Sequence, residues 1–122
     1  MLQVGIRRHG KVMSTVPILM IDTGADETML HLTRATEMGY QEDDLIEETC
    51  STAGGEATTY RPKDISRTEL EIGGSWYQLP SLRFSPTVRC PLLGRNMIFD
   101  HFDLRMTPST FELIPRTRTR RR

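Results

Sequence analysis

Residues 16–30 read VPILMIDTGADETML, and this stretch decides the fold that the sequence predicts. The run VPILMI is continuous and apolar, which is typical of a β-strand buried on both faces. It ends abruptly at DTGAD, a cluster of residue types that favour a turn. We therefore expect Asp22 to project from a tight loop at the end of an apolar strand, where an ionised carboxylate is costly unless it is compensated.

The segments around this stretch read mostly as short strands. Residues 2–6 alternate apolar and polar side chains, and His9-Gly10 indicates a turn after them. Residues 49–61, TCSTAGGEATTYR, and residues 69–80, ELEIGGSWYQLP, each place a Gly-Gly pair between two strand-like arms. Both patterns predict a hairpin. Residues 82–94, LRFSPTVRCPLLG, add further strand, and their apolar run ending in a glycine weakly echoes VPILMIDTG.

Two short helices and a closing strand complete the prediction. From residue 29 to residue 38 the apolar period lengthens, and Gly39 indicates a helix stop. RNMIFDHF, residues 95–102, reads as a second helix, and STFELIP, residues 109–115, as a strand. Many short strands with two brief helices predict an all-β domain with a closed or folded-over sheet. A solvated loop is expected where acidic residues gather, at Glu42, Asp43, Asp44, Glu47 and Glu48.

Length and charge fit one domain with a basic end. A chain of 122 residues is expected to form one domain around one hydrophobic core, and we assign residues 1–115 to that domain. The net charge of zero hides an asymmetry, because residues 116–122, RTRTRRR, contain five arginines. We interpret this tail as solvated and disordered. Basic residues elsewhere are scattered and no recognition motif accompanies them, so no nucleic-acid partner is expected.

Targeting, metal and nucleophile signals are weak. The longest apolar run, residues 16–21, is far shorter than the roughly 20 residues that cross a bilayer. The first residues lack the pattern of a signal peptide, and Cys50 and Cys90 match no metal spacing. We read them as reduced thiols, which favours a cytoplasmic location, and a single disulfide between them is the alternative. The histidines are far apart and suggest neither a metal site nor a catalytic triad.

The tripeptide Asp-Thr-Gly does not choose a reaction by itself. It is also ordinary chemistry for a turn or a helix cap, and strand-Asp-x-Gly loops bind phosphate in some nucleotide-hydrolysing folds. A phosphate site would also need a glycine-rich cradle, a lysine and metal ligands, and the sequence offers no such set.

The wider context resembles the retropepsin-like, or retroviral-type, aspartic proteases. Residues 19–30, LMIDTGADETML, resemble the active-site signature of that family. Residues 91–99, PLLGRNMIF, resemble its apolar-apolar-Gly strand that leads into a C-terminal helix, and residues 51–57, STAGGEA, fall where the family carries a glycine-tipped flap. The helical reading after residue 29, the single Gly-Gly and the arginine tail are closer to cellular and bacterial single-domain relatives than to viral enzymes.

The resemblance implies an aspartic endopeptidase that is a homodimer with a retropepsin-like acid protease fold. Its chemistry needs two carboxylates that share a proton and activate a water. This chain has one Asp-Thr-Gly, so the second aspartate would come from another copy across a twofold axis. The implied substrate is a peptide or protein, no cofactor or metal is implied, and a weakly acidic optimum is expected. How the dimer interface is built is left open.

The resemblance also implies roles for individual residues. Asp22 would be the catalytic carboxylate; Thr23 would hydrogen-bond across the dyad, and Gly24 would let the loops pack closely. Asp26 would contact the substrate backbone and pair with Arg95, although a purely structural ion pair is an equal alternative. The remaining substrate-binding and supporting residues would be Ala25, Ala53, Gly54, Gly55, Leu93 and Gly94. The rival function is a non-catalytic dimerisation or peptide-binding module with the same fold.

Overall fold

The computed structural model describes residues 2–13, 17–52 and 55–116, with only the backbone described at Cys50 and Thr52. Its helices are α1 (Thr33–Glu37), the 3-10 helix η1 (Glu42–Asp44) and α2 (Arg95–His101). Its strands are β1 (Leu2–Gln3), β2 (Gly5–Arg8), β3 (Lys11–Val12), β4 (Ile18–Asp22), β5 (Met29–His31), β6 (Leu45–Thr52), β7 (Gly55–Pro62), β8 (Thr68–Ile72), β9 (Ser75–Gln78), β10 (Arg83–Ser85), β11 (Leu92–Gly94), β12 (Phe102–Met106) and β13 (Phe111–Pro115). The all-β prediction is confirmed.

The main sheet is mixed and brings the two apolar motifs together. Its strand order is β1-β4-β11-β5-β10-β7-β6. Strands β4 and β11 are parallel neighbours, with Met20 opposite Leu92 and Asp22 opposite Gly94. The weak echo between VPILMIDTG and VRCPLLGRN is therefore a spatial relation, because the two strands lie side by side and end at the same edge.

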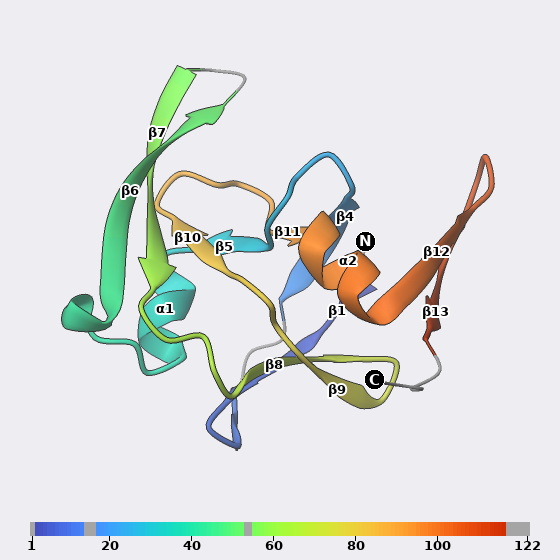
Figure 1. Cartoon of the computed structure of the whole chain (residues 1–122), viewed down its shortest axis with the longest axis horizontal. Coiled ribbons are helices and arrows are strands. Elements are labelled where there is room, and N and C mark those ends of the chain that lie inside the picture. The colour runs from blue at the N-terminus through green and yellow to red at the C-terminus, as the bar shows by residue number, and fades with distance from the viewer. Residues whose placement is uncertain (1, 14–16, 53–54, 117–122) are drawn as a thin grey trace.

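Hairpins account for most of the remaining strands. Strands β6 and β7 pair from Leu45 opposite Pro62 to Thr52 opposite Gly55, and this hairpin projects from the body (Figure 1). A second sheet has the order β3-β2-β8-β9. Strands β12 and β13 form a separate two-stranded arm on the other side of the molecule (Figure 1). The predicted hairpins at both Gly-Gly pairs and the predicted closing strand are confirmed.

The core draws side chains from both larger sheets and from α1 and α2. The Tyr40 hydroxyl lies 2.9 Å from Thr68 Oγ1 within it, which satisfies both buried groups. Burial of the apolar members supplies the main driving force for folding. They are Val4, Ile6, Leu19, Leu30, Ala35, Met38, Tyr40, Leu70, Ile72, Leu79, Leu82, Phe84, Leu93, Met97, Ile98 and Phe102.

The helix expected over residues 29–38 is wrong in its first part. Residues 29–31 form β5, which lies between β11 and β10, and only residues 33–37 are α-helical. Leu30 is fully buried there, opposite Phe84 of β10. Pairing with strands far along the chain overrides the local periodicity. The predicted stop is confirmed, because Gly39 has φ +85° and donates its N–H to Thr36 O at 3.0 Å.

Two other expectations are corrected. Strand β4 is not buried on both faces, since Ile18 is 54% and Met20 40% exposed in the described chain while Leu19 is buried. The acidic segment is not one loop: residues 42–44 form η1, and Glu47 and Glu48 lie in β6. The example of β4 shows that a continuous apolar run does not by itself predict burial on both faces of a strand.

The described residues contain no helix long and apolar enough to cross a membrane. Of the predicted tail, Arg116 donates its backbone N–H to His101 O at 3.0 Å and its Nε to Asp103 Oδ1 at 3.1 Å. Residues 117–122 lie outside the described part of the chain, so the expected disorder stays a prediction.

Candidate active site

Asp22 is the last residue of β4, and the loop that follows holds its carboxylate. The Gly24 N–H donates to Asp22 Oδ1 at 2.9 Å, and the Ala25 N–H donates to Asp22 O at 3.2 Å. The loop therefore turns back on itself directly after the strand. Asp22 is half-buried, whereas Thr23 and Gly24 are exposed. One carboxylate oxygen is thus oriented by the backbone while the turn stays open to solvent.

The same loop is fastened to the start of α2. The Arg95 N–H donates to Ala25 O at 2.7 Å, and the Asn96 N–H donates to Asp26 O at 2.9 Å. These are N–H groups of the first helical turn, which have no partner inside a helix. Loop carbonyls satisfy them, so the position of the loop is set by the helix rather than by its own residues alone.

Gly94 provides the close approach that makes this fastening possible. Its N–H donates to Thr28 Oγ1 at 3.1 Å, and Thr28 is buried. A Cβ at position 94 would lie 2.2 Å from the carbonyl carbon of Glu27 and 2.6 Å from the Thr28 nitrogen. The φ of Gly94 is −84°, which other residues adopt easily. A glycine is therefore required here for space and not for backbone conformation.

The pairing of Asp26 with Arg95 that the family resemblance implies is present as an ion pair between Arg95 Nη2 and Asp26 Oδ1. Both side chains are largely exposed, so the pair contributes little to stability by itself. Leu93, the third supporting residue, is fully buried in the core. The predicted residues on β4, its loop and the β11–α2 junction are thus brought together. The substrate-binding role of Asp26 stays a prediction.

Of the predicted flap residues, Gly55 lies within the described part of the chain. Ala53 and Gly54 lie outside the described residues. Gly55 begins β7 with φ +116°, a backbone conformation that side chains disfavour. Strands β6 and β7 form the expected hairpin, and its role as a flap stays a prediction.

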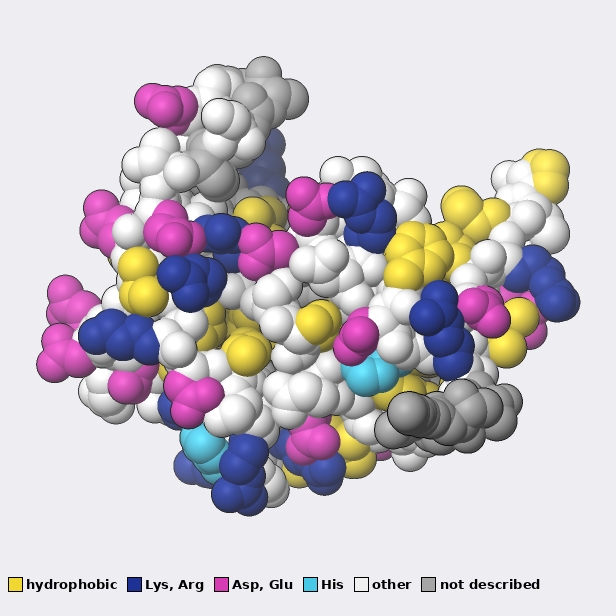
Figure 2. Space-filling view, viewed as in Figure 1, with side chains coloured by type: hydrophobic (Ala, Val, Ile, Leu, Met, Phe, Trp, Pro, Cys, Tyr) yellow, Lys and Arg dark blue, Asp and Glu magenta, His cyan; other side chains and the backbone are white. Residues whose placement is uncertain are grey.

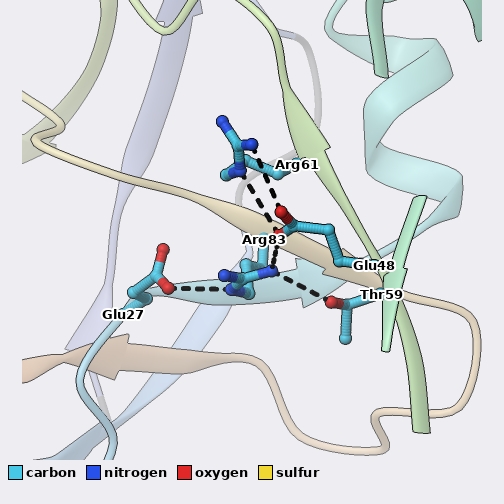
Figure 3. A network of polar contacts seen from close by, with 5 residues as sticks. All are labelled: Glu27, Glu48, Thr59, Arg61 and Arg83. Atoms are coloured by element: carbon cyan, nitrogen blue, oxygen red, sulfur yellow. Dashed lines mark hydrogen bonds and ion pairs between the residues drawn. The ribbon is translucent and has the colours of Figure 1, made fainter. Parts of the chain in front are cut away.

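A polar network connects that hairpin with the Asp22 loop, and no pattern in the sequence predicted it. Arg83 Nε donates to Glu27 Oε1 at 2.8 Å, and Arg83 Nη1 donates to Glu48 Oε1 at 2.6 Å. The same Nη1 lies 3.2 Å from Thr59 Oγ1, and Arg61 Nη2 donates to Glu48 Oε2 at 3.2 Å. Figure 3 shows the Arg83 guanidinium between the two carboxylates. The five residues come from four segments, namely the loop before β5, β6, β7 and β10, so only the fold assembles them.

The charges of this network reinforce one another. Hydrogen bonds from Arg61 and then from Arg83 hold the pKa of Glu48 below its ordinary value. Partial burial alone would lower the pKa of Arg83, but its hydrogen bonds to Glu27 and Glu48 outweigh this effect and raise it. Arg83 and Glu48 are therefore both charged at neutral pH.

The Glu48 contacts predict a pH-dependent contribution to stability. Because the pKa of Glu48 is lowered on folding, its contribution is complete above the ordinary glutamate pKa of about 4.3 and is lost as pH falls below that value. We expect the melting temperature of the parent to exceed that of Glu48→Gln at neutral pH, and the difference to shrink progressively as the pH is lowered below about 4.3. Thermal unfolding of both at equal protomer concentration measures this. A difference that stays constant over the range would contradict it.

Within the described ranges, no three His, Cys, Asp or Glu side chains gather to hold a metal ion. Figure 2 shows acidic and basic side chains interspersed below the projecting hairpin and hydrophobic ones near α2 and the β12–β13 arm. The site therefore consists of the Asp22 carboxylate on a hydrogen-bonded loop and of the β6–β7 hairpin, which Arg83 connects with that loop.

Comparison with known proteins identifies the family and the fold to which this arrangement belongs. A family model described as aspartyl protease matches residues 10–96, whereas no curated protein matches the chain. The fold is similar to the crystal structure of a retropepsin-like aspartic protease from Rickettsia conorii, with a TM-score of 0.62 and 19% identity over 86% of this chain and 82% of that one. The matched residues include the Asp22 loop, the hairpin and the β11–α2 junction. The chain therefore belongs to the aspartyl protease family and has a retropepsin-like fold.

Proposed function

We propose that this protein is an aspartic endopeptidase in which two copies of the chain each supply one Asp22. The observation that carries the proposal is the placement of Asp22 at the end of β4. One of its oxygens accepts the Gly24 N–H, and its loop is fastened to the β11–α2 junction. A carboxylate fixed in this way is oriented before substrate arrives, which is what acid–base chemistry requires.

The proposed reaction uses the two carboxylates in different protonation states. Two carboxylates brought close together cannot both ionise easily, so the pair retains a proton at mildly acidic pH. The ionised member takes a proton from a water, whose oxygen attacks the peptide carbonyl carbon. The protonated member donates to the carbonyl oxygen. Breakdown of the tetrahedral intermediate then passes a proton to the leaving amine.

A second copy is needed because this chain has a single Asp-Thr-Gly. Side chains alternate along a strand, so Ile18, Met20 and Asp22 share one face of β4. Ile18 and Met20 are exposed apolar side chains in the single chain. An apolar surface next to the carboxylate is consistent with cover by a substrate or by a second copy. In the dimer, Thr23 would hydrogen-bond to the opposite loop.

The hairpin and the rest of the loop would bind the peptide. Closure of β6–β7 over the substrate would exclude water and bring backbone donors of Ala53, Gly54 and Gly55 to it. Ala25 and Asp26 would line the cleft floor beside Asp22. Leu93, Gly94 and Arg95 would support the loop from below. With these roles, the cleft would bind an extended segment of a peptide or protein substrate.

The proposal predicts that activity depends on dimer formation. An unfolded protein incubated with the chain at mildly acidic pH should give discrete peptides, detected by mass spectrometry. On dilution below the dimer dissociation constant, the activity per chain should fall in proportion to the remaining dimer, measured in parallel by analytical ultracentrifugation. Undiminished activity in a solution of monomers would contradict the shared site. Dimers that bind peptides without cleaving them would favour the non-catalytic module.

A further inference from the structure

Arg83 lies between the loop that follows Asp22 and the β6–β7 hairpin, and its side chain contacts Glu27, Glu48 and Thr59. We propose that Arg83 is a positioning residue that couples the β6–β7 hairpin to the loop carrying Asp22. The inference deepens the proposed function and rests on it for its catalytic consequence. Its mechanical part, that one side chain holds the two segments together, can be tested without any activity.

On the loop side, Arg83 is fixed by both its backbone and its side chain. Its N–H donates to Thr28 O at 3.0 Å, and its Nε donates to Glu27 Oε1 at 2.8 Å. The backbone of Glu27 is in turn packed against Gly94. A displacement of the Arg83 side chain would therefore be transmitted to a loop segment that has little room to move.

On the hairpin side, Arg83 contacts both strands at one level. Glu48 of β6 and Thr59 of β7 are directly opposite each other in the hairpin register. Arg83 Nη1 reaches both of them, at 2.6 Å and 3.2 Å. A contact to a cross-strand pair constrains the hairpin as a unit, whereas a contact to one strand would leave the other free to twist.

The level of this contact is where the hairpin leaves the body. Thr59 is 1% exposed, and its neighbour Tyr60 pairs with Phe84 of β10. Further toward the tip, Thr49, Ser51 and Glu56 are exposed. The Arg83 guanidinium therefore binds the hairpin where it leaves the body of the molecule. A contact at this point influences the direction in which the outer parts of β6 and β7 extend.

Only an arginine can make this bridge. Its planar fork presents several N–H donors in fixed directions, so one side chain serves two carboxylates, whereas the lysine ammonium is a point charge on a flexible stem. Arg61 supplies the second positive charge, on Glu48, so the two carboxylates face two guanidinium groups. All these side chains are between 22% and 40% exposed, which places the network between surface and core.

The first test compares Arg83→Gln with Arg105→Gln. Arg105 is the matched control because it is 69% exposed on β12 and its ion pair is with Glu112 of the same hairpin. Hydrogen exchange followed by mass spectrometry should show faster exchange in β6, β7 and residues 22–28 of Arg83→Gln only, with β2 and β8 unchanged. An unchanged hairpin, or uniformly faster exchange across the whole chain, would overturn the proposal.

The second test asks whether the two halves of the bridge act together. Glu27→Ala removes the loop side and Glu48→Ala the hairpin side. If Arg83 couples the segments, each should lower kcat/KM by about tenfold to a hundredfold, and the double variant should lose no more than the larger single loss. Independent, multiplying losses would show that no coupling exists. Arg83→Lys should recover only part of the activity, and full recovery would show that charge alone suffices.

The outcomes separate the two proposals. If the parent cleaves no peptide but Arg83→Gln alone loosens the hairpin, the proposed function fails and the bridge is supported. If the parent is an active dimer and Arg83→Gln changes neither hairpin exchange nor kcat/KM, the bridge is refuted and the protease function stands.

Discussion

Replacing Asp22 by asparagine is expected to abolish peptide hydrolysis. In a homodimer this one substitution removes both carboxylates, so neither a base for the water nor an acid for the carbonyl is left. Loss of positioned acid–base catalysis alone lowers rates by about 10²–10⁴-fold, and we expect at least the upper part of this range. The asparagine amide can still accept the Gly24 N–H, which is 2.9 Å from Asp22 Oδ1 in the parent. The fold should therefore survive.

The measurement is kcat/KM on a peptide identified from the parent's cleavage products. Asp43→Asn, at an exposed carboxylate of η1, is the matched control and should keep full activity. Residual cleavage by Asp22→Asn at the parental rate would show that another group or a contaminant is responsible.

Mixing parent and Asp22→Asn chains tests whether the site is shared. If subunits exchange freely, an equal mixture contains about one quarter parental dimers, and activity should fall to about one quarter of that of parent alone at the same total concentration. A mixture that retains half the activity would mean that each chain acts with its own aspartate.

Replacing Gly94 by alanine is expected to produce the largest loss of stability. The new Cβ would lie 2.2 Å from the Glu27 carbonyl carbon and 2.4 Å from its oxygen, and both are backbone atoms that cannot rotate away. Overpacking of this kind typically costs about 1–3 kcal/mol when side chains can adjust, so a backbone clash should exceed about 3 kcal/mol. The loop that carries Asp22 would be pushed off the start of α2, and activity should fall with stability.

Chemical denaturation at a fixed protomer concentration measures this, since the stability of a dimer depends on concentration. Gly10→Ala is the contrasting variant: its φ is +81°, and a Cβ there meets nothing within 4 Å. It should cost only the strain of a left-handed residue, about 1–2 kcal/mol. Equal losses for the two variants would contradict the steric account of Gly94.

Local chemistry accounts for the features that could be predicted from the residues alone. A long apolar run ending in Asp-Thr-Gly predicted the strand and turn at Asp22, because few other structures satisfy such a change in polarity. The Gly-Gly pairs predicted the hairpins, and Gly39 predicted the end of α1, since glycine permits backbone conformations that other residues avoid. The pairing of Asp26 with Arg95 came from family resemblance rather than from the residues themselves.

Features that depend on neighbours distant in sequence became visible only in the folded chain. Residues 29–31 became a strand because β10 and β11 flank them, and β4 exposes Ile18 and Met20 because the core lies on its other face. Gly94 is indispensable because the Glu27 backbone approaches it. Arg83 joins the hairpin to the Asp22 loop through residues from three other segments of the chain, which are the loop before β5, β6 and β7. The physical reason is common to all: side-chain and backbone contacts across sheets carry no signature in the local sequence, so they appear only when the strands have paired.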